Sequence, residues 1–302
     1  MAKVQTKNTK RIFNRDETIS AYLFLLPALL FFVGFVIIPM ILCLVTSFFD
    51  YTMTEFKFVG LKNYSEMFFK DKVFLKSLFN TFLIVVVSVP AVTIFSLWVS
   101  SAIYNLKGWI CSFFRCIFYL PVVTGTVAVT VVWKWMFNQY TGLFNYVLKA
   151  GGVIDKNVSW LGNEKIAIWC IILILFTTSI GQPIVLYVSA LGNVDASLIE
   201  ASEVDGATKL QVFWKIKWPQ IMPTTLYILV ITTINSFQCY ALVQLLTSGG
   251  PNNSTSTVMY YIYYEAFKLY RYGYGNAMGV ILAIIIAVFS AIQFKVAGQS
   301  RD

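Results

Sequence analysis

Histidine is absent from this 302-residue chain, and charged residues make up only 12% of it. Without histidine, the chain lacks the commonest general base of enzymes and a frequent metal ligand. Soluble domains carry about 25% charged residues, so a chain with half that share is not an ordinary soluble globule. Together these two absences exclude a soluble enzyme that works through histidine and favour a protein that resides in an apolar environment.

Cysteine is present, but not in patterns that bind metal. No two cysteines have C-x-x-C spacing, and no histidine is available to complete a zinc site. All of them lie in or beside apolar runs, where cysteine acts as a small packing residue. The sequence therefore predicts no metal site. The five cysteines are Cys43, Cys111, Cys116, Cys170 and Cys239.

A phosphate-binding loop is missing as well. The pattern G-x-x-x-x-G-K-[ST], which cradles nucleotide phosphates, does not occur, and no lysine with serine or threonine follows Gly151 and Gly152 as it requires. No catalytic group of side chains takes its place. We therefore expect no enzyme and no cofactor in this chain. Energy must come from another subunit, which would hold ATP and magnesium, or from an ion gradient.

Hydrophobic residues, in contrast, reach 58% and fall in long runs. A helix crosses a bilayer with about 20 residues, and neighbouring helices compensate for prolines and glycines within it. The chain is therefore expected to be an all-α, polytopic membrane helix bundle with its transmembrane domain over residues 20–298. Six spans are predicted, at residues 20–49, 77–104, 113–137, 166–190, 223–246 and 277–294.

Basic residues set the expected orientation. They cluster in residues 1–19, before the first apolar run, and such clusters remain in the cytoplasm. An even number of spans then places both termini in the cytoplasm. The first run is much longer than the core of a signal peptide, about 7–15 residues, so we expect it to be retained. The net charge of +9 does not by itself indicate a nucleic-acid partner, and none is expected.

Charge within the predicted spans is nearly absent, and Lys134 is the exception that stands out. It lies about 30 Å along a helix from Phe113, which places it at the outer interface, beside Trp133 and Trp135. A position in the substrate path is the alternative for this lysine. Ion-coupled carriers usually keep ionisable residues at bilayer depth. Their scarcity disfavours proton coupling and favours a neutral, hydroxyl-rich solute.

One charged segment, residues 195–219, interrupts the apolar pattern between the fourth and fifth spans. Its first half has apolar residues at helical spacing, and Gly206 is expected to end that helix because glycine readily adopts positive φ. A second short helix is predicted over residues 210–216, before Pro219. The result is a cytoplasmic helix–turn–helix finger that can transmit a push to the spans. The alternative is an ordinary amphipathic loop on the membrane.

The finger resembles the cytoplasmic EAA motif of binding-protein-dependent ABC importer permeases. Glu200-Ala201-Ser202, then Gly206, then Ile216 and Pro219 keep the spacing of that motif, with Ser202 and Trp218 as departures at packing positions. The resemblance implies a type I importer fold in which this coupling helix docks on an ATPase subunit. The residues that it assigns to coupling are Glu200, Ala201, Ser202, Asp205, Gly206, Ala207, Ile216 and Pro219.

Other segments resemble the carbohydrate-uptake branch of the same family, in particular the first permease of the maltose and glycerol-phosphate importers. The resemblance implies a bacterial cytoplasmic membrane protein that works with a second, non-identical permease, ABC ATPase subunits that hold ATP and magnesium, and an external solute-binding protein. The matching segments are Tyr22–Pro27, Gly60–Tyr64, Asn80–Thr81, Phe118–Pro121 and Leu245–Pro251.

Polar residues in the fourth and fifth spans are candidates for the substrate path. Sugars are held by hydrogen bonds together with packing on aromatic rings, for which Phe237 and Tyr240 are suited. The alternative is that these residues make hydrogen bonds between helices, worth about 0.6 kcal/mol each. The candidates are Thr177, Ser179, Gln182, Thr232, Asn235, Ser236, Gln238 and Tyr240.

The sequence therefore predicts the permease subunit of an ATP-driven importer for a sugar or oligosaccharide. The same kind of importer for another solute, such as glycerol phosphate, is one alternative. An ATP-independent carrier or channel is another, and it would need no partner ATPase.

Overall fold

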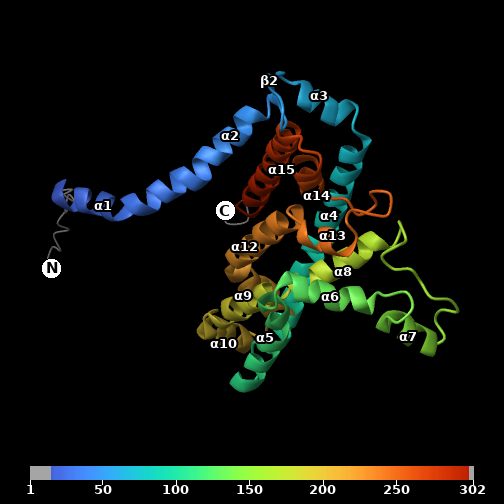
Figure 1. Ribbon diagram of the computed structural model, residues 1–302. Helices are drawn as coiled ribbons and strands as arrows, with labels where there is room; N and C mark the ends of the chain where they lie inside the picture. The colour runs from blue at the N-terminus through green and yellow to red at the C-terminus, as the bar shows by residue number, and fades with distance from the viewer. Residues whose placement is uncertain (1–14, 299–302) are drawn as a thin grey trace.

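The computed structural model describes residues 15–298, and these are almost entirely helical (Figure 1). The expected all-α class is confirmed, because the only sheet within the described residues is a two-stranded hairpin of β1 (Phe49–Tyr51) and β2 (Phe56–Phe58). Of the predicted cytoplasmic segment 1–19, residues 1–14 lie outside the described part. The helices after the hairpin are α3 (Lys62–Phe69), α4 (Lys72–Ile103), α5 (Gly108–Val123), α6 (Thr126–Met136), α7 (Leu143–Ala150), α8 (Ala167–Ser179), α9 (Gly181–Gly192), α10 (Ala196–Val204), α11 (Lys209–Val212), η2 (Phe213–Lys217), α12 (Trp218–Phe237), α13 (Ala241–Leu246), α14 (Val258–Tyr263), η3 (Tyr264–Lys268) and α15 (Tyr272–Gly298).

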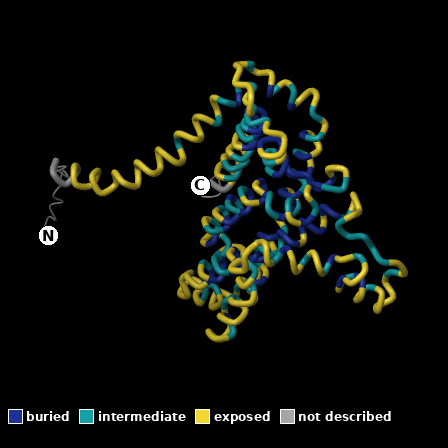
Figure 2. The backbone as a smooth tube through the Cα atoms, in the orientation of Figure 1, coloured by how far each residue is buried: buried dark blue, intermediate teal, exposed yellow. Residues whose placement is uncertain are grey.

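An N-terminal helix projects from the bundle, and only its last part contacts α15 (Figure 1). It consists of α1 (Arg15–Phe32), a π-turn η1 (Val33–Ile37) and α2 (Ile38–Thr46) in direct succession. Its most apolar stretch is not buried at all (Figure 2). Such a helix requires lipid or another protein around it. The first predicted span extends to Phe49, whereas the helix ends at Thr46 and Phe49 lies in β1.

The long helix α4 forms the centre of the bundle and contacts α8, α9 and α12. Small polar residues allow close approach, since the Ser96 and Ser100 hydroxyls donate to the Ile180 and Ile184 carbonyls of the neighbouring chain segment at 3.3 and 3.1 Å. Interfaces between membrane helices favour such small residues. The position of α4 thus depends on serines that the apolar pattern alone does not single out.

Three of the predicted spans contain a break where one helix was expected. In the range 113–137, α5 and α6 meet at 95°, and in the range 166–190, α8 and α9 meet at 40°. In the range 223–246, α12 ends at Phe237 and α13 begins only at Ala241. A proline inside a helix removes a backbone hydrogen bond and favours such breaks, and Pro121 precedes the sharpest one.

Six membrane-crossing helices were expected, and length and composition alone identify fewer. By length and composition, three helices within the described residues meet the requirement, and up to five do so if each bent pair counts as one span. The long helix α12 is not among them. Its last two turns carry Thr232, Thr233, Asn235 and Ser236, so part of it is polar.

A charged and tyrosine-rich junction holds the end of the bundle at which α3 and α15 meet (Figure 1). Arg271 contacts Glu66 at 2.5 Å and Glu265 at 3.2 Å. Asp71 caps α4 through the Val73 and Phe74 amides. Its second carboxylate oxygen accepts hydrogen bonds from the Tyr261 and Tyr274 hydroxyls at 2.8 and 2.7 Å. One carboxylate thereby joins α4, α14 and α15.

Candidate functional site

The charged segment 195–219 folds as a finger at the end of the molecule where α5 and α10 lie (Figure 1). Its first helix, α10, starts after Asp195, whose carboxylate accepts a hydrogen bond from the Ser197 amide at 2.9 Å. Hydrogen bonds from the Ser197 side chain and backbone lower the pKa of Asp195. A charged cap satisfies an amide that has no partner within the helix.

Gly206 ends α10, as the sequence predicts. Its φ of +80° lies in the left-handed region. The Gly206 N–H donates to the Glu203 carbonyl at 3.0 Å, and the Ala207 N–H donates to the Ser202 carbonyl at 2.9 Å, which together form a Schellman C-cap. A Cβ at Gly206 would meet no atom within 4 Å. Within this chain, therefore, backbone conformation rather than crowding requires glycine here.

The second half of the finger differs from the short helix expected over residues 210–216. Thr208 and Gln211 form a capping box, and the helix then continues through α11, η2 and α12 from residue 209 to residue 237. Pro219 does not interrupt it, because it lies in the first turn of α12, directly after the π-turn η2. The finger is thus continuous with a helix of the bundle.

The inner face of the finger packs on the bundle. Ile199 of α10, Ile216 of η2 and Trp218 of α12 contact one buried apolar cluster. Both arms of the finger are therefore anchored to the same core. The cluster consists of Tyr187, Leu191, Val194, Ile221 and Ile228.

The outer face of the finger exposes large apolar side chains beside acidic ones. Val204 is 88% exposed, Leu210 69% and Trp214 54%, and Glu200 and Ala201 are also exposed. Clustered exposed apolar residues with a polar rim are typical of a surface that a partner covers.

A hollow of about 390 Å³ lies between the two arms of the finger. Gln211 and Lys215 line it and were not predicted, although the T-x-x-Q capping signature marks Gln211 as an ordered position. Glu200, Ala201 and Pro219 are exposed and do not line it. The predicted coupling residues that do line it are Ser202, Asp205, Gly206, Ala207 and Ile216.

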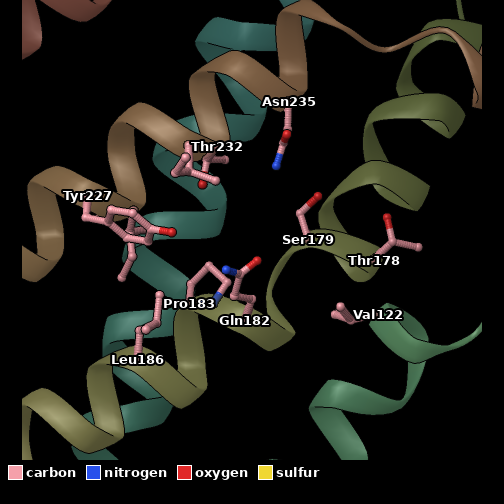
Figure 3. A pocket seen from close by; sticks show the side chains of 11 residues that line it. Val122, Thr178, Ser179, Gln182, Pro183, Leu186, Tyr227, Thr232 and Asn235 are labelled. Atoms are coloured by element: carbon pink, nitrogen blue, oxygen red, sulfur yellow. The ribbon is translucent and has the colours of Figure 1, made fainter. Parts of the chain in front are cut away.

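A polar cavity of about 150 Å³ lies among α5, α8, α9 and α12 (Figure 3). The amide groups of Gln182 and Asn235 and the hydroxyl of Ser179 point toward its interior (Figure 3). The cavity brings together residues from the two spans that the sequence selected. The predicted path residues that line it are Ser179, Gln182, Thr232 and Asn235.

A second cavity of about 270 Å³ adjoins the first and shares Val122 and Thr178 with it. The predicted residues Gln238 and Tyr240 line it. Thr124 and Thr126, at the break between α5 and α6, also line it and were missed. Pro121 and Gly125 are the sequence signal for that break.

Three residues proposed for the path are engaged elsewhere. The Thr177 hydroxyl donates to the Ile174 carbonyl of its own helix at 2.9 Å. Ser236 is buried against Ser88, with their hydroxyl oxygens 3.0 Å apart. Phe237 is fully buried and packs on Phe82 and Phe289 rather than facing a cavity. Of the three, Ser236 makes the hydrogen bond between helices that was the alternative reading, and neither Thr177 nor Phe237 lines the cavities.

A second basic residue lies near the cavities, in addition to the Lys134 that the sequence singles out. Arg115 lies within the predicted span 113–137, so Lys134 is not the sole basic residue there. Arg115 lines a third hollow, of about 550 Å³, which shares Gln182 with the 150 Å³ cavity. Lys134 instead donates to the Leu245 carbonyl at 3.4 Å.

Metal-binding groups are not found within residues 15–298: no cluster of three histidine, cysteine or acidic side chains is placed to hold an ion. The site therefore offers hydrogen bonding, apolar contact and one nearby guanidinium group.

Comparison with known proteins identifies the family. A family model described as "Binding-protein-dependent transport system inner membrane component" matches residues 64–297. The chain is 31% identical to the multiple sugar-binding transport system permease protein MsmF of Streptococcus mutans, with 86% of this chain and 93% of the relative covered. It is 29% identical to the arabinooligosaccharides transport system permease protein AraP of Bacillus subtilis, with 93% and 89% covered.

A solved structure has the same fold. It is the crystal structure of a bacterial alginate ABC transporter in complex with an alginate pentasaccharide-bound periplasmic protein, with a TM-score of 0.79, 22% identity and coverage of 93% of this chain and 95% of that chain. Apolar helices, the finger between α9 and α12 and the family match over most of the length agree with one another. The chain belongs to the family of binding-protein-dependent transport system inner membrane components.

Proposed function

We propose that this chain is the permease subunit of an ATP-driven importer for a sugar or oligosaccharide. The observation that carries the proposal is the continuous helix from residue 209 to residue 237, which begins in the finger and ends at the polar cavities. A displacement of the finger would move that helix and with it Thr232 and Asn235. The names of MsmF and AraP, which refer to sugar and oligosaccharide transport, support a carbohydrate as the solute.

In this proposal, each partner subunit has a separate role. ATP and magnesium reside on cytoplasmic ABC ATPase subunits, which bind the outer face of the finger around Glu200, Ala201 and Val204. A second, non-identical permease completes the path beside α5, α9 and α12, and an external binding protein delivers the solute. The finger then marks the cytoplasmic side, and both chain termini lie on that side, as the basic cluster in residues 1–19 favours.

Hydrogen-bonding chemistry supports a hydroxyl-rich solute. Gln182 and Asn235 each offer an amide donor and an amide acceptor, and Ser179 and Thr232 offer hydroxyls that do both. Tyr240 adds an aromatic ring at the second cavity. Neutral groups of both kinds suit a sugar, whose hydroxyls donate and accept in turn.

An anionic solute such as glycerol phosphate is the second candidate, and one observation favours it. Arg115 lines the hollow that adjoins the 150 Å³ cavity at Gln182, and a guanidinium group binds phosphate well. Uptake of a labelled sugar in competition with a panel of neutral sugars and phosphodiesters separates the two. Competition by sugars alone supports the main proposal, and competition by phosphodiesters alone overturns its substrate class.

The experiment that tests the transport role is reconstitution. The chain is placed in liposomes either alone or together with a second permease, ATPase subunits and a solute-binding protein. Solute uptake that needs ATP and the complete assembly supports the proposal. Uptake by the chain alone, without any ATPase, would show an ATP-independent carrier or channel instead.

A further inference from the structure

Lys217, at the end of the finger, contacts the cytoplasmic end of the central helix α4 across a large distance in sequence. Its ammonium group donates a hydrogen bond to the hydroxyl of Tyr104. Tyr104 is the residue that directly follows α4, and its amide donates to the Ser100 carbonyl at 3.0 Å. The finger and α4 are thus joined by a polar contact between side chains.

The hydroxyl, rather than the face of the ring, carries this contact. The Lys217 ammonium lies 4.9 Å from the centre of the Tyr104 ring. The phenolic oxygen is the nearer partner of the ammonium group, so the hydrogen bond to the hydroxyl is the more direct contact. Removal of the hydroxyl alone therefore removes the interaction and leaves the ring in place.

Lys217 has no acidic partner within residues 15–298, where both ion pairs belong to Arg271. A partly buried ammonium group needs a hydrogen-bond acceptor, and Tyr104 supplies it. Tyr104 is itself held, since it packs against two apolar clusters, one around Ile184 and Val188 and one around Tyr187 and Leu191. It is a fixed point at the junction of two parts of the core.

Lys217 is also the last residue of the π-turn η2. A π-turn is a local widening of the helix and often marks a functional position. At this turn, a force on the finger has two possible outcomes: bending of the helix at η2, or motion of the finger together with the bundle. A contact from the turn to α4 favours the second outcome.

We propose that Lys217 and Tyr104 are positioning residues that lock the finger to α4, so that a displacement of the finger moves α4 together with α12. This inference rests on the proposed function, because it concerns how the finger transmits force. Without the lock, the finger moves on the turn η2, and ATP hydrolysis proceeds with less transport.

The test measures solute uptake and ATP hydrolysis in the same proteoliposomes that hold the complete transporter. The variants are Tyr104→Phe, Lys217→Met, the double variant and Lys217→Arg. Lys107→Met is the matched control, because Lys107 is an exposed basic residue close to Tyr104 whose side chain makes no hydrogen bond or ion pair within residues 15–298. The yield of assembled complex and its thermal midpoint are measured alongside.

We expect the ratio of uptake to hydrolysis to fall about fivefold in Tyr104→Phe and in Lys217→Met at unchanged complex yield. The double variant is expected to fall no further than either single one, since both remove the same interaction. Lys217→Arg, which keeps a cationic donor, and Lys107→Met should retain the wild-type ratio.

An unchanged ratio in Tyr104→Phe overturns the inference, because that variant keeps the packing of the ring. Losses that add in the double variant overturn it as well, since they show two separate roles. Absence of ATP-dependent uptake in the wild-type complex is a different result: it contradicts the proposed function itself.

Discussion

Single residues decide the shape of the finger and the character of the cavity. Gly206 is needed for its φ of +80°, since a Cβ there would have open space around it. Asn235 is needed for its chemistry, because its amide group points into the cavity from the last turns of α12 (Figure 3). At each of these two positions, a substitution can separate the role of the residue from that of the surrounding helix.

Gly206→Ala is expected to destabilise the C-cap of α10 by about 1–2 kcal/mol, the cost of a left-handed conformation for a residue with a Cβ. Uptake by the reconstituted transporter should fall while the protein remains in the membrane. Gly192→Ala is the control, because Gly192 also has open space at its Cβ position but has no positive φ. Equal effects of the two substitutions would show that the conformation of Gly206 is not what matters.

Asn235→Leu is expected to reduce uptake about tenfold, which corresponds to about 1.4 kcal/mol for lost hydrogen bonds to the solute. Association with the ATPase should be unchanged. Thr177→Val is the comparison, because the Thr177 hydroxyl bonds within its own helix and should tolerate the change. If Thr177→Val reduced uptake as much as Asn235→Leu, the cavity shown in Figure 3 would not be the path.

Among the junctions between helices, the one at Asp71 determines how α4, α14 and α15 meet. Asp71→Ala removes the cap of α4 and the acceptor for Tyr261 and Tyr274. Loss of the cap alone costs about 1 kcal/mol, and each hydrogen bond to a charged group adds about 1.5–3 kcal/mol. The thermal midpoint of the purified complex should therefore fall by several degrees.

The matched control for Asp71 is Asp155→Ala, because Asp155 is exposed in a loop and its side chain makes no hydrogen bond or ion pair within the described residues. Its thermal midpoint should stay at the wild-type value. Two equal midpoints for Asp71→Ala and wild type would show that the junction does not hold the helices.

The sequence predicted the long helices well and their breaks poorly. Long apolar runs such as that in α4 identify a membrane helix, because about 20 consecutive apolar residues are needed to cross a bilayer. The 95° bend after Pro121 and the end of α12 at Phe237 depend on contacts between distant segments. One such contact is the close approach of the Phe118 carbonyl to Gly181. A hydropathy pattern does not record which segments meet.

The same distinction applies to the site. Ser179, Gln182 and Asn235 were predicted from their polarity within apolar runs, and they line a cavity. Ser236 has the same polarity, but it faces α4 and bonds to Ser88. Packing decides which face of a helix meets a cavity. Polarity alone does not record that face, and it therefore selected Ser236 and Thr177 together with the residues that line the cavity.

Across the whole molecule, two apolar surfaces of the described residues are exposed. The helix from Arg15 to Thr46 is exposed along its apolar stretch, and the outer face of the finger exposes Val204 and Leu210. Exposed apolar surface of this extent is typical of regions that lipid or another protein covers. The proposed assembly with a second permease and ATPase subunits would cover both surfaces.

Gly206→Asp tests the partner surface of the finger, since it adds a carboxylate and a strained residue at the finger's turn. It is expected to reduce ATP-dependent uptake at least tenfold and to weaken binding of the ATPase in pull-down from membranes. The amount of permease in the membrane should remain at the wild-type level. Unchanged uptake with unchanged ATPase binding would remove the finger from the coupling route.

The transport role is tested most directly by ATP-dependent accumulation of labelled sugar in proteoliposomes that hold this chain with a second permease, ATPase subunits and a binding protein. We expect accumulation that requires ATP, is lost with Gly206→Asp and is absent when this chain is reconstituted alone. Sugar uptake at an equal rate without ATP, or by this chain alone, would show that the chain is not the permease of an ATP-driven importer.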